Sequence, residues 1–155
     1  MDNIIIDKVF PNLDNKLIKI VQNRIDSFKT SLQKGELQID LNSDLQSDLI
    51  KVFLFSEFIA SNLTRSPDIL NDLTNSRDLF KSYSSHTYTV KLEKQIHKKM
   101  DVAAVKAILL YNKLYENIRI AWRDLSGRAQ LEETLEDLSN LADSIVDAAI
   151  TTLYI

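Results

Sequence analysis

The chain has 155 residues, 45% of them hydrophobic, which is enough apolar material for one packed domain. Its 22 acidic and 19 basic side chains give a formal net charge of -3, a balance that argues against an electrostatic nucleic-acid binder. There is no cysteine, which excludes disulfides and thiolate chemistry, and only two glycines and two prolines, which favours helices over sheets and tight turns.

Two amphipathic stretches predict the first two helices. In residues 13–34 apolar side chains recur every three or four positions, and Gly35 follows as a usual helix stop. A capping-box pattern at residues 43–46, with Ser43 as the cap, predicts a second helix that continues to about Thr64. Residues 52–55 of that helix are all apolar, so we expect neighbours on several sides and take it as the central helix.

Shorter elements are predicted in the middle of the chain. Ser66 followed by Pro67 is typical of a helix start and predicts a short helix over residues 67–74. The polar, serine-rich residues 75–87 predict an irregular connection with about one helical turn. A modest helix is expected over residues 88–99.

Two long helices are predicted in the last third of the chain. Asp101 can cap a helix from Val102 to about Ser126, and Gly127 can end it. The last helix, from about Ala129, is strongly amphipathic. Its apolar face comprises Leu131, Leu135, Leu138, Leu141, Ala142, Ile145, Val146, Ala149 and Leu153. Because no helix stop follows this pattern, we expect the chain to be part of a longer protein.

These elements predict an all-α protein, an irregular bundle of about five to six helices that forms a single domain over residues 1–155. No apolar run approaches the roughly 20 residues that span a bilayer. The N-terminus also lacks the basic flank and long apolar stretch of a secretory signal. We therefore expect a cytoplasmic location, with neither a membrane nor a nucleic acid as partner.

The sequence offers no catalytic, nucleotide-binding or metal-binding motif. The two glycines are isolated from each other and cannot make a phosphate-binding loop. His86 and His97 are not spaced to share a helix face. Carboxylates four residues apart in the last helix, such as Glu132 and Glu136, are typical of a solvated face. We expect no catalytic residue, metal site or cofactor site within this chain.

Arg119 and Arg123 are the most informative polar pair, because they lie one helical turn apart beside the only tryptophan, Trp122. Their forked guanidinium groups could pair with Glu132 or Glu136 after the following turn, or with a carboxylate or phosphate from elsewhere. We favour the first interpretation, an ion-pair network that joins the last two helices.

Two groups of residues resemble a known enzyme family. One group comprises residues 119–127, with the sequence Arg-Ile-Ala-Trp near its start, and residues 131–135, 138–143 and 153–154. It resembles the helical segment before the first nucleotidyltransferase core of the bifunctional glutamine synthetase adenylyltransferase and adenylyl-removing enzyme. The other group, residues 52–60 and 63–70 with Arg65, resembles that family's early motif, S-x-F-h-A followed by R-x-P-x-h-L.

The resemblance implies an enzyme that regulates glutamine synthetase in nitrogen metabolism. One half would attach AMP from ATP to a tyrosine, and the first half would remove it by phosphorolysis. Both would use Mg²⁺ and respond to the P-II signal protein and glutamine. This chain lacks the G-M-G-K-L-G-G stretch and the D-x-D motif of such a core. It would therefore be an inactive N-terminal helical fragment of the adenylyl-removing half, packed against its own nucleotidyltransferase core.

The same resemblance marks candidates for structural or contact roles, namely Arg65, Arg119, Trp122, Arg123 and Asp124. We expect both arginines of the long helix to organise the junction of the last two helices, with Asp124 near the turn.

The alternative is a free-standing helical interaction module. Phe53, Phe55 and Phe58 would then form a surface for a partner helix or an acidic-peptide groove. That interpretation predicts a gene that stops at Ile155 and an isolated chain that binds its partner tightly.

Overall fold

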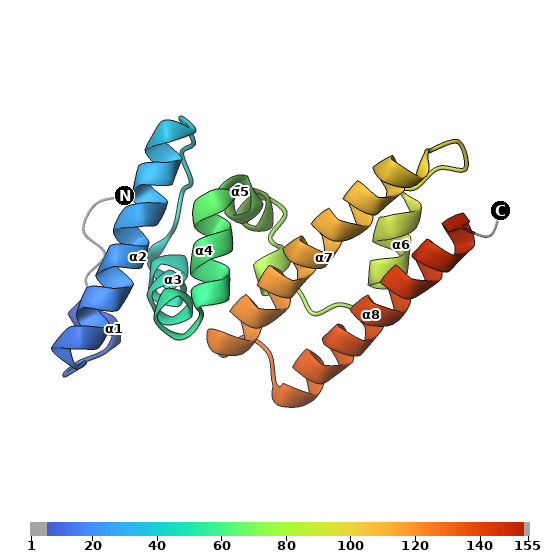
Figure 1. The fold of residues 1–155 in the computed structure, drawn as a ribbon. Helices are drawn as coiled ribbons and strands as arrows, with labels where there is room; N and C mark the ends of the chain where they lie inside the picture. The colour runs from blue at the N-terminus through green and yellow to red at the C-terminus, as the bar shows by residue number, and fades with distance from the viewer. Residues whose placement is uncertain (1–5, 154–155) are drawn as a thin grey trace. The chain divides into compact units, whose positions relative to one another are not determined.

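The computed structural model describes residues 6–153, and this part of the chain consists of α-helices, one 3-10 helix and their connections, with no strand (Figure 1). The all-α prediction is confirmed. None of the described helices is long and apolar enough to cross a membrane. Residues 154 and 155, where the last helix was expected to continue, lie outside the described residues.

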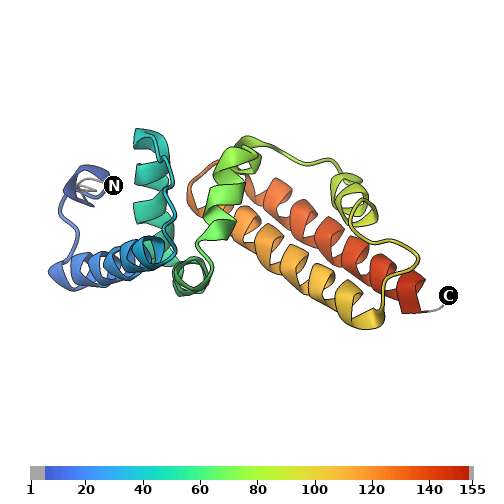
Figure 2. The same ribbon diagram turned by 90° about the horizontal axis from the view of Figure 1, so that it is seen from above.

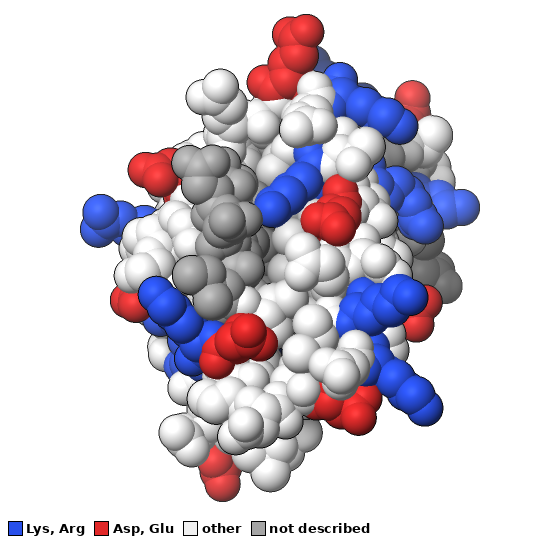
Figure 3. All heavy atoms as spheres, turned by 90° about the vertical axis from the view of Figure 1, so that its left-hand side faces the viewer, with Lys and Arg blue, Asp and Glu red and all other residues white. Residues whose placement is uncertain are grey.

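The chain divides into two compact units, Met1–Leu79 and Phe80–Ile155. That one domain spans residues 1–155 stays a prediction. On the face shown in Figure 3, basic and acidic side chains alternate and neither sign forms a continuous patch, as expected from the balanced composition.

The described part of the first unit contains five α-helices. They are α1 (Ile6–Val9), α2 (Asn15–Lys34), α3 (Ser43–Phe55), α4 (Glu57–Arg65) and α5 (Asp68–Asn75). α2 packs on α3 and α4 through its apolar stripe, in which Val21, Ile25 and Phe28 are buried. The rings of Phe28 and Phe53 meet edge to face with centroids 5.6 Å apart, a favourable aromatic geometry. The short 3-10 helix η1 (Asp78–Phe80) follows α5, as the one expected helical turn.

The predicted second helix is wrong in one respect, because it is two helices that meet at Ser56. Ser56 has extended backbone angles, φ -131° and ψ 103°, and its hydroxyl accepts a hydrogen bond from the backbone N–H of Ile59 at 3.1 Å. A serine hydroxyl satisfies exposed N–H groups in this way, so it starts a new helix at the expense of the old one. The break leaves Phe53 buried, whereas Phe55 and Phe58 are exposed.

Other helix ends also differ from the prediction. Asn42, not Ser43, caps α3, since its side-chain oxygen accepts from the N–H of Leu45 at 3.0 Å. α6 (Thr87–Glu93) is shorter than the expected helix over residues 88–99. The short helix α1 had no sequence signal strong enough to predict it.

The second unit is built on a helical hairpin, α7 (Val102–Leu125) and α8 (Leu131–Leu153), which run antiparallel with α6 against them (Figure 2). Asp101 caps α7 as predicted, with its carboxylate 2.7 Å from the N–H of Ala104. Gly127 has φ 76°, a left-handed conformation that suits glycine and ends the helix.

Only one edge of the apolar face predicted for α8 is buried, and the rest of that face is exposed. Asp137, Leu141 and Ser144 are buried, whereas Leu131 and Leu135 on the apolar face are exposed. α8 is therefore held in the second unit both by buried polar side chains and by Leu141, which packs in a core cluster with Tyr88 and Ile120. The buried side of α8 determines which of its side chains can contact α7.

Candidate functional site: a buried arginine network

Arg119 and Arg123 project from α7 into the interior of the second unit, with 0% and 2% of their surface exposed. Trp122 between them is also fully buried. A guanidinium group removed from water is costly unless charged and polar partners surround it. The partners of these two arginines therefore define the site.

Arg119 binds side chains and backbone from three parts of the unit. Its Nη1 donates to Asp137 Oδ2 on α8 and to the hydroxyl of Tyr88 on α6, each at 3.2 Å. Its Nη2 donates to the backbone carbonyl of Lys81 at 2.7 Å. The guanidinium lies over the ring of Tyr83, 3.4 Å from its centroid. One cation thus ties together α6, α7, α8 and the segment before α6.

Glu116 lies between two cations. It is buried, and its Oε2 is 3.9 Å from Arg119 Nε, one turn along α7. Lys91 of α6 donates to the other carboxylate oxygen. The same ammonium group lies 4.9 Å from the ring centroid of Tyr83 and 5.0 Å from that of Tyr115. The network therefore extends along α7, with positively and negatively charged side chains in alternation.

Arg123 holds the turn between α7 and α8. Its Nη2 lies 2.6 Å from Glu133 Oε1 and 3.3 Å from both the Ser82 hydroxyl and the Arg128 carbonyl. The contact with Glu133 is a charge-assisted hydrogen bond, the stronger kind. Arg123 thus connects the start of α8, the turn and the segment before α6.

The predicted helix-to-helix pairing is confirmed in kind but wrong in its partners. The acceptors are Glu133 and Asp137, each one residue beyond the expected Glu132 and Glu136, which are exposed. Within each pair the two carboxylates are four residues apart, so the sequence spacing fits pairing with the two arginines equally well in both cases. The conformation of the turn decides the rotation of α8 and hence which pair faces α7.

The remaining predicted residues fall in different places. Asp124 is exposed beside the turn, and its Oδ1 accepts a hydrogen bond from the Thr134 hydroxyl at 3.1 Å, so it lies where we expected. Arg65 belongs to the first unit, exposed at the end of α4, and is no member of the network.

Four participants were missed in the sequence, namely Tyr83, Tyr88, Lys91 and Glu116. Only Glu116 carried a signal, because an acidic residue three positions before an arginine on a helix is an expected pair. Tyr83 comes from a segment whose path the sequence pattern did not define. Tyr88 and Lys91 lie in the predicted helix over residues 88–99, but its pattern did not show that they face α7.

The surroundings of Arg119 and Glu133 favour the charged form of each, and those of Tyr88 favour its neutral form. Burial acts to lower the pKa of Arg119, but Tyr88, Tyr83 and the two carboxylates hold it above the ordinary value. Burial, followed by a hydrogen bond to Asp137, raises the pKa of Tyr88 far above its usual range. Partial burial acts to raise the pKa of Glu133, but hydrogen bonds from Ser82 and Arg123 lower it overall.

The chemistry of this site is that of a fixed scaffold. It is filled by its own side chains, and it contains no nucleophile next to a general base. Among the described residues, no group of three or more His, Asp or Glu side chains is placed to hold a metal ion. The arrangement is suited to fixing how α7, α8 and α6 pack together.

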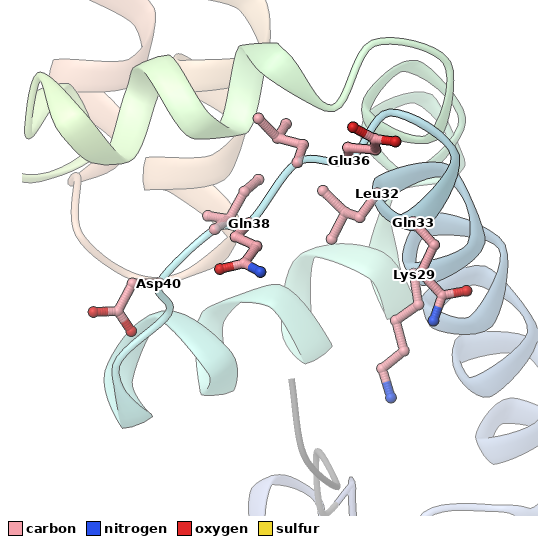
Figure 4. A pocket seen from close by; sticks show the side chains of 8 residues that line it. Lys29, Leu32, Gln33, Glu36, Gln38 and Asp40 are labelled. Atoms are coloured by element: carbon pink, nitrogen blue, oxygen red, sulfur yellow. The ribbon is translucent and has the colours of Figure 1, made fainter.

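A large pocket of the first unit does not offer a better site. It is an open hollow of about 930 Å³ under the connection between α2 and α3. Figure 4 shows that Lys29, Glu36 and Asp40 lie at different sides of it and do not converge on one point. A binding site needs polar groups that converge on a ligand.

Together the fold and the network define an all-helical module whose second unit is organised by buried arginines. The family model described as glutamate-ammonia ligase adenylyltransferase matches residues 46–155, which include this network. The chain belongs to that family, so the resemblance seen in the sequence is confirmed at this level.

Curated relatives carry the name bifunctional glutamine synthetase adenylyltransferase/adenylyl-removing enzyme. The protein from Nitrosococcus oceani is 31% identical over 144 residues, covering 90% of this chain and 15% of the relative. The protein from Psychromonas ingrahamii is 33% identical over 120 residues, covering 76% and 13%. That from Shewanella oneidensis is 34% identical over 115 residues, covering 74% and 12%. No solved structure matches the chain. The chain thus spans about one seventh of the length of such relatives or less.

Proposed function

We propose that this chain is the non-catalytic, N-terminal helical part of the adenylyl-removing half of a bifunctional enzyme that regulates glutamine synthetase. The family match over residues 46–155 carries the proposal. The buried arginine network supports it, because a rigid hairpin suits the support of a catalytic core.

The reaction would take place on the core and not on this chain. Inorganic phosphate would attack the phosphorus of a tyrosyl-AMP, the bond from phosphorus to the tyrosine oxygen would break, and the products would be ADP and free tyrosine hydroxyl. In this proposal Mg²⁺ and ATP would bind to the catalytic parts of the enzyme, whose glycine-rich and D-x-D motifs the present sequence lacks. In this proposal glutamine synthetase is the substrate, the P-II protein a regulator, and the location cytoplasmic.

The reading frame downstream of Ile155 tests this proposal directly. We expect a glycine-rich segment followed by paired aspartates within about one domain length, 100–150 residues. A reading frame that stops at Ile155, or continues without those motifs, would contradict it.

An enzyme assay tests the division of labour. The isolated chain, incubated with adenylylated glutamine synthetase and phosphate, should release no ADP. A chimera in which this chain replaces the matching segment of the N. oceani relative should release it. Phosphorolysis by the isolated chain would show that the non-catalytic role is wrong.

The free-standing interaction module is less well supported. Phe53 is fully buried against Phe28, so the proposed three-phenylalanine surface reduces to Phe55 and Phe58. The ring of Phe55 also packs edge to face on Phe10, with centroids 5.8 Å apart. The same reading frame decides between the two proposals.

A further inference from the structure

One row of apolar side chains on α8 is open to solvent along the helix. Large apolar side chains on it are between 42% and 64% exposed, namely Leu131, Leu135, Leu138, Val146 and Ile150, and Ala142 between them is also exposed. Isolated apolar side chains on a surface are common, but a continuous row along one helix marks an interaction site.

One side of α8 is already occupied within the second unit. Asp137 and Leu141 face α7, and the hydroxyls of Ser144 and Thr89 of α6 lie 2.9 Å apart. At 3.6 residues per turn, the buried row and the exposed apolar row point about 100° or more apart. A rotation of α8 that buried its leucines would therefore break the bonds to Arg119 and Arg123.

The open row continues into a groove between the two helices of the hairpin. This groove has a volume of about 340 Å³, and its walls include Val105 and Leu109 of α7 and Ile145 and Ala149 of α8. The row and the groove together form one apolar surface on the same side of the hairpin, which we call the α8 surface.

An acidic row borders the α8 surface. Glu132, Glu136, Asp143 and Asp147 are all exposed on the neighbouring side of the helix. A complementary partner would present apolar side chains with lysines or arginines beside them, because opposite charges at the rim favour the correct register.

We infer that the α8 surface is the docking site for the polypeptide that a full-length enzyme of this family carries beyond the region matched here, through an apolar surface with a basic border. This inference rests on the proposed function, since it assigns the contact by which the helical part would support the core. The relatives are about seven times longer than the matched region, so most of each lies outside it. The acidic row favours basic side chains of the occupant along the α8 border, whereas Lys106 and Lys113 of α7 line the groove at the other border.

Thiol labelling tests the inference, because the chain has no cysteine of its own. Leu138→Cys places one thiol on the α8 surface, and Leu17→Cys is a matched control on α2, with starting exposures of 42% and 41%. Labelling rates are measured on the isolated chain and on the chimera with the N. oceani relative, and mass spectrometry of the peptide separates the new thiol from cysteines of the relative.

We expect the Leu138→Cys variant to react about tenfold or more slowly in the chimera than in the isolated chain, with no change for the Leu17→Cys variant, since thiol reactivity follows exposure. Adding Glu136→Lys should restore the rate in the chimera only. The inference would be overturned if labelling slowed equally in both variants, or in neither, on going from the isolated chain to the chimera. Slow labelling of the Leu138→Cys variant in the isolated chain would also overturn it. If a second copy of the chain were the occupant, dilution would restore the labelling rate.

Phosphorolysis by the chimera separates the two proposals. Protection without release of ADP leaves the docking site standing and contradicts the proposed role in adenylyl removal. Release of ADP with full labelling of the Leu138→Cys variant contradicts the docking site alone.

Discussion

Arg119 is a cation without access to water whose charge is balanced inside the protein. A carboxylate, a phenol, a backbone carbonyl and an aromatic ring surround its guanidinium group. These partners come from three segments of the second unit besides α7 itself, so the side chain specifies how these segments pack. Buried ion pairs of this kind add little net stability over apolar packing, but removing one partner is costly because the other charges stay buried.

Replacing Arg119 tests this interpretation. Arg119→Met keeps most of the side-chain volume but leaves Asp137 and Glu116 buried beside an apolar group. We expect a loss of about 3–5 kcal/mol in the free energy of unfolding, measured by urea denaturation. Asp137→Asn, which keeps a hydrogen-bond acceptor for Arg119, should cost less. Equal stability of the Arg119→Met variant and the parent would show that the network does not hold the unit together.

Arg123→Ala should lower both stability and adenylyl-removing activity of a full-length enzyme that carries this chain. The change removes the bonds to Glu133, Ser82 and Arg128. The Glu133 side chain is 27% exposed and can be rehydrated. We therefore expect a loss of about 1–3 kcal/mol in the free energy of unfolding, measured by urea denaturation of the chain. Arg65→Ala is the control, within about 0.5 kcal/mol of the parent. Lost activity with an unchanged Tm would indicate direct contact with substrate or core.

Acidification should lower the free energy of unfolding in part through protonation of Glu133. Its pKa is lower in the folded chain than its ordinary value of 4.5, so the folded state binds this proton less readily than the unfolded state. The stability that Glu133 contributes is therefore present above about pH 4.5 and is lost as the pH falls through the folded-state pKa. Urea unfolding from pH 7 to 3 should show a shallower decline for Glu133→Gln than for the parent. Parallel curves would contradict this assignment.

At the scale of helices, caps and interruptions decide the fold more than helix propensity does. The caps at Asp101 and Gly127 were predictable, because each follows a local rule that one or two residues carry. The break at Ser56 was not predictable, since serine occurs both inside helices and at their starts, and the apolar pattern continues across it. Local rules compete there, and packing of Phe53 decides.

Ser56→Ala tests the break between α3 and α4. It removes the acceptor of the Ile59 N–H, and we expect a loss of about 1 kcal/mol in the free energy of unfolding, as for other caps. Ser61→Ala, which removes only a hydroxyl bonded to the Phe58 carbonyl on an exposed face of α4, serves as the control with a smaller effect. A Ser56→Ala variant as stable as this control would mean that the cap does not stabilise α4.

For the whole molecule, the sequence by itself determined the helical class, most helix ranges, the arginine pair at the hairpin and, through its motifs, the family. These features depend on composition, periodicity and short spacings, which are local along the chain. Tertiary structure alone decided that α8 turns Glu133 and Asp137 inward and leaves most of its leucines exposed. An amphipathic pattern shows that a helix has an apolar face, but not which neighbour covers it. In α8 two buried arginines demand carboxylates, and their desolvation outweighs the burial of the leucine row.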